Sequence, residues 1–469
     1  MTKIYQLKGK GQGKDPGPGS VLDGPGGLEA SPAAQRPSKT KSKIKSKPKA
    51  KSAPVERYLA PPPPRDGKVI GLDCHPDSFT AAVYVGQTPH DARKITSREN
   101  LSLEGLLQWA RATLTPADII LLEAGSNSFE VCRRLGSLGL RTCVLESGYV
   151  GQHAKTYADN DKMAASRIAL VYLAGKAPCV WVPDERSRER RELLHAYNNA
   201  VSDHTAATNC LKSYLNGRGI RLGKRSLARP QTTPWILRQR EWTALQSQLL
   251  QELLTNFTEA KERRKRLNRL IATEMAGDPL MMRCMKVLGV GVVSAFALVA
   301  VIGDIQRFPT SGQLVAYIGL NPGQRQSGKS KNIRLGIGGH GRGDLRNLLI
   351  QGAQAVLRQG RHTALGQWGW RLFARKGNRN IAVAAIARKL VVQVWHLLQG
   401  HPSTVLDDDK SFQVKVHKLA VTLGASLRQE LGLGETLPQG IQLILQRFSQ
   451  DPGLPRNVSP NPNPSPLPG

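Results

Sequence analysis

Short apolar runs between residues 66 and 150 constrain the fold of this chain more than any other feature. Two helical patterns, LEGLLQWARATL (103–114) and SFEVCRRLGSLG (128–139), separate these runs. The predicted order is β-β-β-α-β-α-β, with the turn CHPD joining the first two strands. The expected strands are KVIGLD (68–73), SFTAAVYV (78–85), RKITS (93–97), ADIILLEA (117–124) and LRTCVLES (140–147).

This order, which opens with a hairpin, favours an α/β domain of the RNase H-like type over residues 66–180. A doubly wound nucleotide-binding fold fits less well. It would place a helix and a glycine-rich turn directly after the first strand, where this chain has a second strand instead.

The rest of the ordered chain is predicted to be mostly helical. Within 181–275, two long charged helical patterns (184–217 and 236–275) flank GRGIRLGKRSLARPQTTPW, and they predict either an intramolecular hairpin or a coiled coil that bridges protomers. A domain over 276–400 opens with a helix-hairpin-helix-like element around Gly289 and Gly291. Such glycines either let a phosphate approach the backbone or simply pack in the core. Residues 401–450 form a helical extension.

The charge of the chain points to a polyanionic partner. Lys and Arg number 67 against 35 Asp and Glu, a formal net charge of +32. Residues 1–65, with lysine at every second position from Lys39 to Lys51, form a basic tail that is either merely solvated or a non-specific nucleic-acid arm. Residues 451–469 are a second disordered, proline-rich end.

No membrane or secretion signal is expected. No apolar run reaches the roughly 18 residues that a membrane span needs, and the N-terminus has no apolar signal core. These features predict a cytoplasmic protein. The six scattered cysteines form no C-x-x-C pair, so we expect them to be reduced and buried.

The segment GQRQSGKS (323–330) matches the phosphate-loop pattern, but its context argues against a nucleotide site. A phosphate loop needs a helix that begins at its Gly-Lys-Ser, and the glycine-rich KNIRLGIGGHGRGD follows instead. We interpret the region as a flexible basic loop that approaches a polynucleotide backbone. Ser327 within it is either an ordinary loop serine or a nucleophile. The cations expected to bind nucleic acid are Arg325, Lys329, Lys331, Arg334, Arg342 and Arg346.

A second candidate site is acidic. Asp73 ends the first predicted strand, Glu123 ends the fourth, and Asp161 opens a helix after the last. In an RNase H-like sheet the first and fourth strands are neighbours, so their carboxylates would converge. Each acid is otherwise an ordinary strand-end or helix-cap residue. Together they predict a Mg²⁺ site, which Mn²⁺ could also fill.

The motifs, taken together, resemble the DEDD transposases of bacterial insertion sequences, which are recombinases guided by a bridge RNA. The resemblance runs from about Lys68 to Gly400 and is carried by GLDCH, LLEAGS, NDKMAASRIA, LGVGVVSAFALVAVIGDIQRFPTSGQLVAYIGLNPGQRQSGKS, RLGIGGHGRGDLRNLL and AIARKLVVQVW. It implies a RuvC-like domain, a helical coiled coil and a second domain with a catalytic serine. It also implies a phosphoserine–DNA intermediate and base pairing of the guide RNA with target and donor DNA.

Carried over to this sequence, the resemblance assigns Asp73, Glu123 and Asp161 to the first three family acids, and Ser327 to the serine. The fourth family acid falls at Ala164, so activity is expected to be impaired. Strand exchange between two duplexes further predicts a homodimer that pairs into a tetramer. Two alternatives stay open: a catalytically impaired scaffold that binds RNA and DNA, and a RuvC-like junction nuclease that uses only the acidic site.

Overall fold

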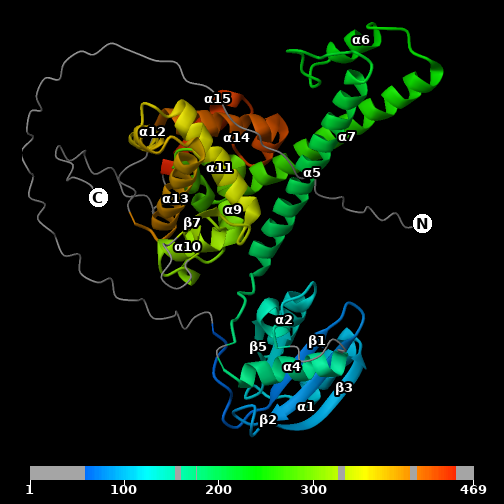
Figure 1. Cartoon of the computed structure of the whole chain (residues 1–469), viewed down its shortest axis with the longest axis vertical. Helices are drawn as coiled ribbons and strands as arrows, with labels where there is room; N and C mark the ends of the chain where they lie inside the picture. The colour runs from blue at the N-terminus through cyan, green and yellow to red at the C-terminus, as the bar shows by residue number, and fades with distance from the viewer. Residues whose placement is uncertain (1–58, 154–159, 176, 326–332, 402–408, 450–469) are drawn as a thin grey trace, which may run out of the picture. The chain divides into compact units, whose positions relative to one another are not determined.

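The computed structural model of the chain describes residues 59–153, 160–175, 177–325, 333–401 and 409–449 (Figure 1). Its N-terminal region is a mixed α/β sheet and its C-terminal region is mostly helical. The described part begins at Leu59, seven residues before the expected start of order. Ala60 donates a backbone hydrogen bond to the carbonyl of Ala177 (2.9 Å) and so attaches this early segment to the α/β region.

The sheet has the predicted β-β-β-α-β-α-β order. Its spatial order is β3-β2-β1-β4-β5, in which β1, β2 and β3 pair antiparallel, while β4 runs parallel to β1 and β5 parallel to β4. The strands are β1 (Val69–Cys74), β2 (Phe79–Val85), β3 (Arg93–Leu101), β4 (Ile119–Glu123) and β5 (Arg141–Leu145).

Both faces of the sheet are covered, because successive side chains of a strand point to opposite sides. On one face, Val69 and Leu121 pack with α4 (Asp161–Leu173), which crosses the strands in Figure 1. On the other face, Leu72 packs with α1 (Leu103–Thr113) and α2 (Ser128–Gly136). The near-continuous apolar runs of β1 and β4 follow from this double burial.

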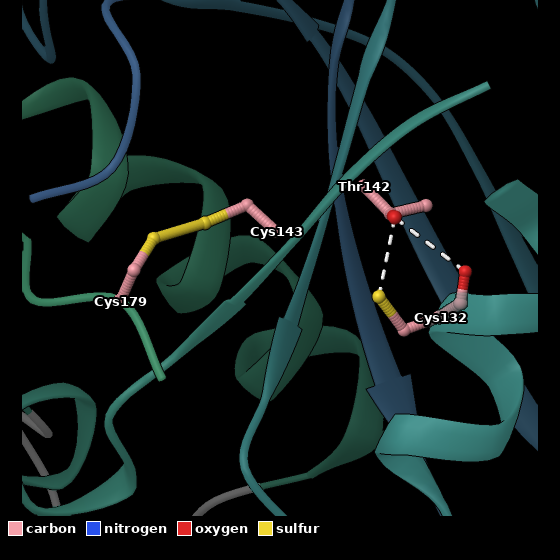
Figure 2. Close-up of a disulfide and its surroundings, with 4 residues drawn as sticks. All are labelled: Cys132, Thr142, Cys143 and Cys179. Carbon is pink, nitrogen blue, oxygen red and sulfur yellow. Dashed lines mark hydrogen bonds between the residues drawn. A yellow bond between two sulfur atoms is a disulfide. The ribbon is translucent and has the colours of Figure 1, made fainter. Parts of the chain in front are cut away.

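A disulfide joins Cys143 of β5 to Cys179, so the prediction that all six cysteines are reduced is wrong (Figure 2). The backbone brings the two together: the amide of Val180 donates to the carbonyl of Val144 at 2.8 Å. The two cysteines are 36 residues apart in sequence, a separation that gives no pairing signal. Four cysteines are free: Cys132 and Cys284 are buried, Cys74 is half-buried and Cys210 is exposed.

The two long helical patterns form α5 (Glu185–Asn216) and α7 (Ala244–Ala276), which pack against each other within one chain. Their antiparallel pairing follows from two contacts: Arg263 pairs with Asp203 at 2.9 Å, and the hydroxyl of Tyr214 donates to the carbonyl of Gln246 at 2.9 Å. Within one chain, the two patterns therefore form an antiparallel hairpin, while bridging of protomers through it stays a prediction. The tip of the hairpin holds the short helix α6 (Thr232–Leu237).

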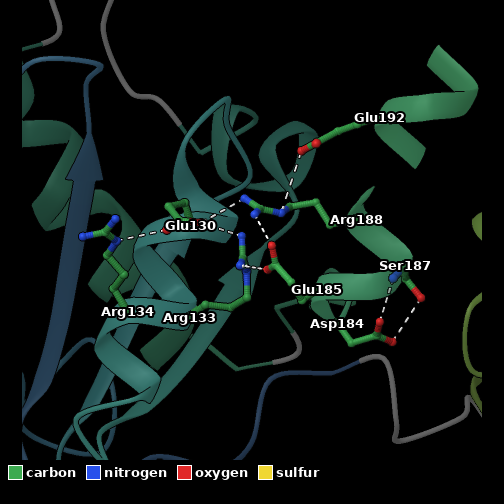
Figure 3. Close-up of polar contacts among 8 residues, drawn as sticks. All are labelled: Glu130, Arg133, Arg134, Asp184, Glu185, Ser187, Arg188 and Glu192. Atoms are coloured by element: carbon green, nitrogen blue, oxygen red, sulfur yellow. Dashed lines mark hydrogen bonds and ion pairs between the residues drawn. The ribbon is translucent and has the colours of Figure 1, made fainter. Parts of the chain in front are cut away.

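A charge network fixes the first turn of α5 to α2 (Figure 3). Glu130 accepts hydrogen bonds from Arg133 (2.6 Å), Arg134 (3.0 Å) and Arg188 (3.0 Å). Glu185 pairs with Arg133 and Arg188 in turn. The hydrogen bond from Arg134, with the charges of the three arginines, lowers the pKa of Glu130, although burial opposes this. The network thus keeps Glu130 ionised in mildly acidic solution.

The C-terminal region is built around a single large core. Its most buried element is α9, in which every residue from Ala295 to Ile302 is at most 7% exposed. In chain order, the elements of this region are α8 (Pro279–Lys286), α9 (Val292–Ile302), η2 (Ile305–Arg307), α10 (Ser311–Ile318), β6 (Pro322–Arg325), β7 (Ile333–Ile337), α11 (Gly343–Gln359), α12 (Ala364–Lys376), α13 (Arg379–Leu398), α14 (Asp409–Glu430) and α15 (Leu437–Ser449).

One helix of the described part, α13, is long and apolar enough to cross a membrane by length and composition. The expectation that no such run exists therefore needs correction. Its buried residues Ala382, Ile386, Leu390 and Val394 recur at helical spacing and belong to the central core. Packing inside the protein accounts for this apolar face.

The turn between α8 and α9 is packed rather than open at Gly289. Gly289 has a left-handed backbone (φ +78°), and a Cβ there would lie 2.9 Å from the carbonyl oxygen of Gly352 in α11. A Cβ on Gly352 would in turn lie 2.3 Å from the oxygen of Gly289. Of the two interpretations of this glycine turn, close packing between helices is the one that the structure favours for Gly289.

Candidate catalytic site

Two of the predicted acids end adjacent strands of the sheet. The parallel register of β1 and β4 pairs Leu72 with Leu122, so Asp73 and Glu123 follow directly on neighbouring strands. By the alternation of side chains, both lie on the face that carries α4. Both residues are half-buried and engaged in polar contacts.

The helix that carries the third acid begins at the same edge of the sheet. Asn160 caps α4 by accepting from the amide of Met163 at 2.9 Å, and Asp161 is the first helical residue. Lys162 pairs with Glu99 (2.5 Å), while Ser166 accepts from Lys94 (3.2 Å). Because β3 runs in the same direction as β1, these contacts orient α4 with its first turn toward the end of β1 that holds Asp73.

A glycine in β1 sets how closely α4 approaches the sheet. A Cβ on Gly71 would lie 2.0 Å from the carbonyl oxygen of Ala165, so only glycine permits this approach. Ala164, the position at which the resemblance predicts a fourth acid, precedes Ala165 and is half-buried one turn after Asp161. The site of the sequence departure is thus next to the tightest helix–sheet contact in this region.

The acidic edge meets part of the requirement for magnesium. Within the described ranges, no three His, Cys, Asp or Glu side chains lie close enough together to hold a metal ion. Mg²⁺ is often held by only one or two carboxylates, with waters and substrate phosphates completing its octahedron. Asp73 and Glu123 suit this arrangement by donor chemistry and position, while the contribution of Asp161 stays a prediction.

The thiol beside this edge is not a nucleophile at neutral pH. Burial, followed by the negative charge of Asp73 and the neighbouring Cys132, raises the pKa of Cys74 to about 12. The thiolate is the reactive form of cysteine, so Cys74 is inert near pH 7.

The serine segment is framed by a β-hairpin. Strands β6 and β7 pair antiparallel, with Arg325 opposite Ile333 and Gln324 opposite Arg334. The interpretation of this region as an unstructured loop is therefore wrong for its two flanks. Ser327, Lys329 and Lys331 lie outside the described residues. A strand begins at Ile333, in the stretch that a phosphate-loop helix starting at the Gly-Lys-Ser would occupy.

The two predicted cations after the hairpin have protein partners. Arg342 donates from Nε and Nη2 to the two carboxylate oxygens of Asp344, at 3.0 and 2.6 Å, at the start of α11. Burial favours neutral forms here, but the pairing outweighs it: the pKa of Arg342 is raised and that of Asp344 is lowered. Arg346 donates to the carbonyl of His340 at 2.7 Å. Both arginines therefore support the turn at residues 338–343.

A basic hollow on the α5–α7 hairpin was not predicted from the sequence. It measures about 210 Å³, and Lys212, Arg225, Lys261 and Arg264 line it. The signal was present but weak: Lys261 and Arg264 recur at helical spacing after the buried Phe257. That spacing places them on one face of α7, but it does not show that the loop residue Arg225 joins them.

Comparison with known proteins points to one family. Residues 282–365, from α8 to α12, match the family described as "Transposase IS116/IS110/IS902 family". The chain is 28% identical over 358 residues to the "Transposase for insertion sequence element IS1111A" of Coxiella burnetii, covering 71% of this chain and 90% of that one. It is 28% identical over 292 residues to a "Probable family 20 transposase" of Pseudomonas aeruginosa (60% and 84%). It is 24% identical over 332 residues to the "Transposase for insertion sequence element IS1328" of Yersinia enterocolitica (70% and 95%).

Proposed function

We propose, on the premise that this chain is an insertion-sequence transposase of the IS116/IS110/IS902 family, that it recombines DNA through a covalent serine intermediate. The observation that carries the proposal is the position of Ser327. It falls inside the span that matches the family, between two paired strands. In the same span, four cations lie within seven residues of Ser327 in the sequence: Arg325, Lys329, Lys331 and Arg334.

In the proposed step, the Oγ of Ser327 attacks a DNA phosphorus and forms a P–O bond. The bond from phosphorus to one sugar oxygen breaks, and the serine proton passes to that leaving oxygen. A sugar hydroxyl of the other duplex then reverses the reaction and releases the serine. The cations around Ser327 stabilise the added negative charge of the pentacoordinate transition state.

The acidic edge is proposed to hold a magnesium ion through Asp73 and Glu123, with Asp161 as a third ligand that would have to approach the other two on binding. When bound, the ion would supply Lewis-acid polarisation of the scissile phosphate, and manganese would substitute for it. The neighbouring strand ends of Asp73 and Glu123 support this assignment. The two carboxylates would repel the phosphates of DNA. We therefore expect DNA binding at this edge to depend on a divalent cation.

A guide RNA is proposed to select the DNA sites by pairing with both target and donor. The protein would then bind backbones rather than read bases, and the formal charge of +32 suits that task. A second candidate function, an RNA- and DNA-binding scaffold without strand cleavage, is favoured by one residue. Ala164 stands where the resemblance predicts the fourth acid.

Two substitutions test the chemistry. We expect Ala164→Asp to raise recombination about 10-fold or more, since ~1.4 kcal/mol of recovered transition-state stabilisation is already tenfold. Adding Ser327→Ala to that variant should abolish both recombination and the protein–DNA adduct. The assay is excision or insertion of the element, with denaturing gels for the adduct and manganese in parallel reactions.

The outcomes separate the candidates. An adduct that persists in the Ala164→Asp, Ser327→Ala protein would place the nucleophile elsewhere. Cleavage of branched DNA without any adduct would favour the junction nuclease. Failure of Ala164→Asp to restore activity, with nucleic-acid binding intact, would favour the scaffold.

A further inference from the structure

A loop folds back on the helical hairpin and closes a hollow against it. Residues 225–228 of the loop face α5 residues His204, Thr208 and Lys212 and α7 residues Phe257, Lys261 and Arg264. The α5 residues are spaced four apart and the α7 residues four and three apart, so each set occupies one helix face. The hollow therefore belongs to a defined side of the hairpin.

The loop is held in place by its own contacts. The guanidinium of Arg225 stacks over the ring of Trp235 at 4.1 Å, and Thr232 donates its hydroxyl hydrogen to the carbonyl of Ser226 at 2.7 Å. Phe257, 6% exposed, gives the hollow a buried apolar floor. These contacts hold the loop, and with it Arg225, in place at the edge of the hollow.

The charged side chains that line the hollow are all cations. Among its lining residues there are four Lys or Arg and no Asp or Glu. In the part of the chain that the structure describes, no ion pair involves Lys212, Arg225, Lys261 or Arg264. Burial, with the charges of Arg264 and Lys261, lowers the pKa of His204, so the imidazole is neutral and accepts from Arg264 at 3.3 Å. The cations are left to bind an external anion.

The opposite side of the same helices has a different charge pattern. The hollow there is lined by Asp203, Glu259 and Glu262 together with Arg263 and Arg266. Arg263 already pairs with Asp203 at 2.9 Å. The hollow on the opposite side therefore lacks the excess of positive charge found in the first.

The cationic surface continues beyond the first hollow. Lys212 also lines a neighbouring hollow of about 500 Å³, together with Asn216, Arg221 and Gly223, again without an acid. Two adjoining hollows that share a lysine suit an anion with repeated charges better than a single small ion. A phosphodiester chain has that repeat.

We propose that this face of the α5–α7 hairpin is a binding site for the phosphodiester backbone of a nucleic acid, separate from the serine and acidic sites. This proposal rests on the proposed function only in taking nucleic acid as the ligand. Lys212, Arg221, Arg225, Lys261 and Arg264 contact successive phosphates, and because phosphate contacts carry no sequence information, the binding is independent of sequence.

The test uses the full chain and a charge-matched control. Lys212→Ala/Lys261→Ala removes two charges from the hollow, and Arg263→Ala/Arg266→Ala removes two from the opposite face. Affinity is measured at several salt concentrations, separately for a duplex DNA and for a single-stranded RNA. For the first variant we expect the plot of log affinity against log salt to become shallower by about 2 for DNA and somewhat less for RNA. The control should change it by less than about 0.5.

Lys212→Arg/Lys261→Arg, which keeps the charges, should bind like the original protein and shows that folding is intact. A reduced slope with either polymer supports the site and identifies which nucleic acid uses it. Equal changes in the hollow variant and the control, or no change with either polymer, would overturn it. The serine adduct is scored in the same variants with Ala164→Asp added, because activity of the unaltered chain is expected to be impaired. Loss of the slope with no adduct in any protein refutes the proposed chemistry and leaves this site standing.

Discussion

A single hydrogen atom in place of a side chain determines how α4 meets the sheet. At Gly71, the carbonyl oxygen of Ala165 occupies the space that a methyl group would need. Both sides of this contact are backbone, so no side-chain rotation relieves a clash. The spacing between β1 and the helix that carries Asp161 and Ala164 depends on this one residue.

We therefore expect Gly71→Ala to lower the free energy of unfolding by about 1–3 kcal/mol or more, by overpacking. Gly151→Ala is the matched control, because nothing lies within 4 Å of the added atom there. Its effect should stay within about 0.5 kcal/mol. Chemical denaturation of both variants measures the difference; equal stabilities would show that α4 shifts without penalty.

At the scale of elements, a buried ion pair connects the helical hairpin to α8. Arg190 of α5 donates to Asp278 at 2.7 Å and to Glu274 of α7 at 3.0 Å. Asp278 also caps α8 by accepting from the amides of Leu280 and Met281. Arg190 and Asp278 are both less than 10% exposed. The packing of α5, α7 and α8 against one another thus depends on the pairing of Arg190 with these two carboxylates.

Arg190→Ala should lower the free energy of unfolding by about 3–5 kcal/mol, because it leaves a buried carboxylate without its partner. Arg186 approaches the same carboxylate at 3.7 Å but is 64% exposed. Arg186→Ala should change stability by no more than about 1 kcal/mol. Denaturation followed by tryptophan fluorescence compares the two; a small effect of both would mean that water replaces Arg190.

Most elements of the fold could be predicted from the sequence, because apolar runs and helical periodicity are local signals. Helix α12 could not. Gly366 and Gly369 lower its helical propensity, yet a Cβ on Gly366 would lie 1.9 Å from the carbonyl oxygen of Gly360, so packing against the end of α11 requires glycine there. The Arg190–Asp278 pair and the Cys143–Cys179 bond join distant positions, which no local pattern reveals. At the acidic edge, the sequence predicted the strand ends correctly, while the metal and the serine chemistry stay predictions.

At the scale of the whole molecule, charge is distributed between the N-terminal tail and the folded chain. Residues 1–58 hold 13 Lys or Arg and 4 Asp or Glu, so about +9 of the +32 would be lost on their removal. We expect deletion of residues 1–58 to make nucleic-acid binding less dependent on salt while guided site choice persists. This boundary keeps Leu59 and Ala60 with the sheet. Loss of guide-RNA recognition would show that the tail has a specific role.

Strand exchange between two duplexes requires several active sites, so we further expect a homodimer that pairs into a tetramer on RNA and DNA. Mass measurement of the complex in solution checks this expectation. A single copy of the chain bound to both duplexes would contradict it. The variant Lys212→Ala/Lys261→Ala should assemble normally, because its charges are assigned to nucleic acid and not to a partner protomer.

The length of α5 can be compared with a distance along duplex DNA. At 1.5 Å per residue, its 32 residues extend about 48 Å, equal to about 14 base pairs of B-form duplex at 3.4 Å each. His204, where the basic hollow begins, is about 28 Å from the first residue of α5, or roughly 8 base pairs. Where the hollow binds duplex DNA, a hairpin of this length would contact it several base pairs away from the first residue of α5. Nuclease footprints should therefore shrink at their outer margins when the hollow's lysines are removed, with the cleavage position unchanged.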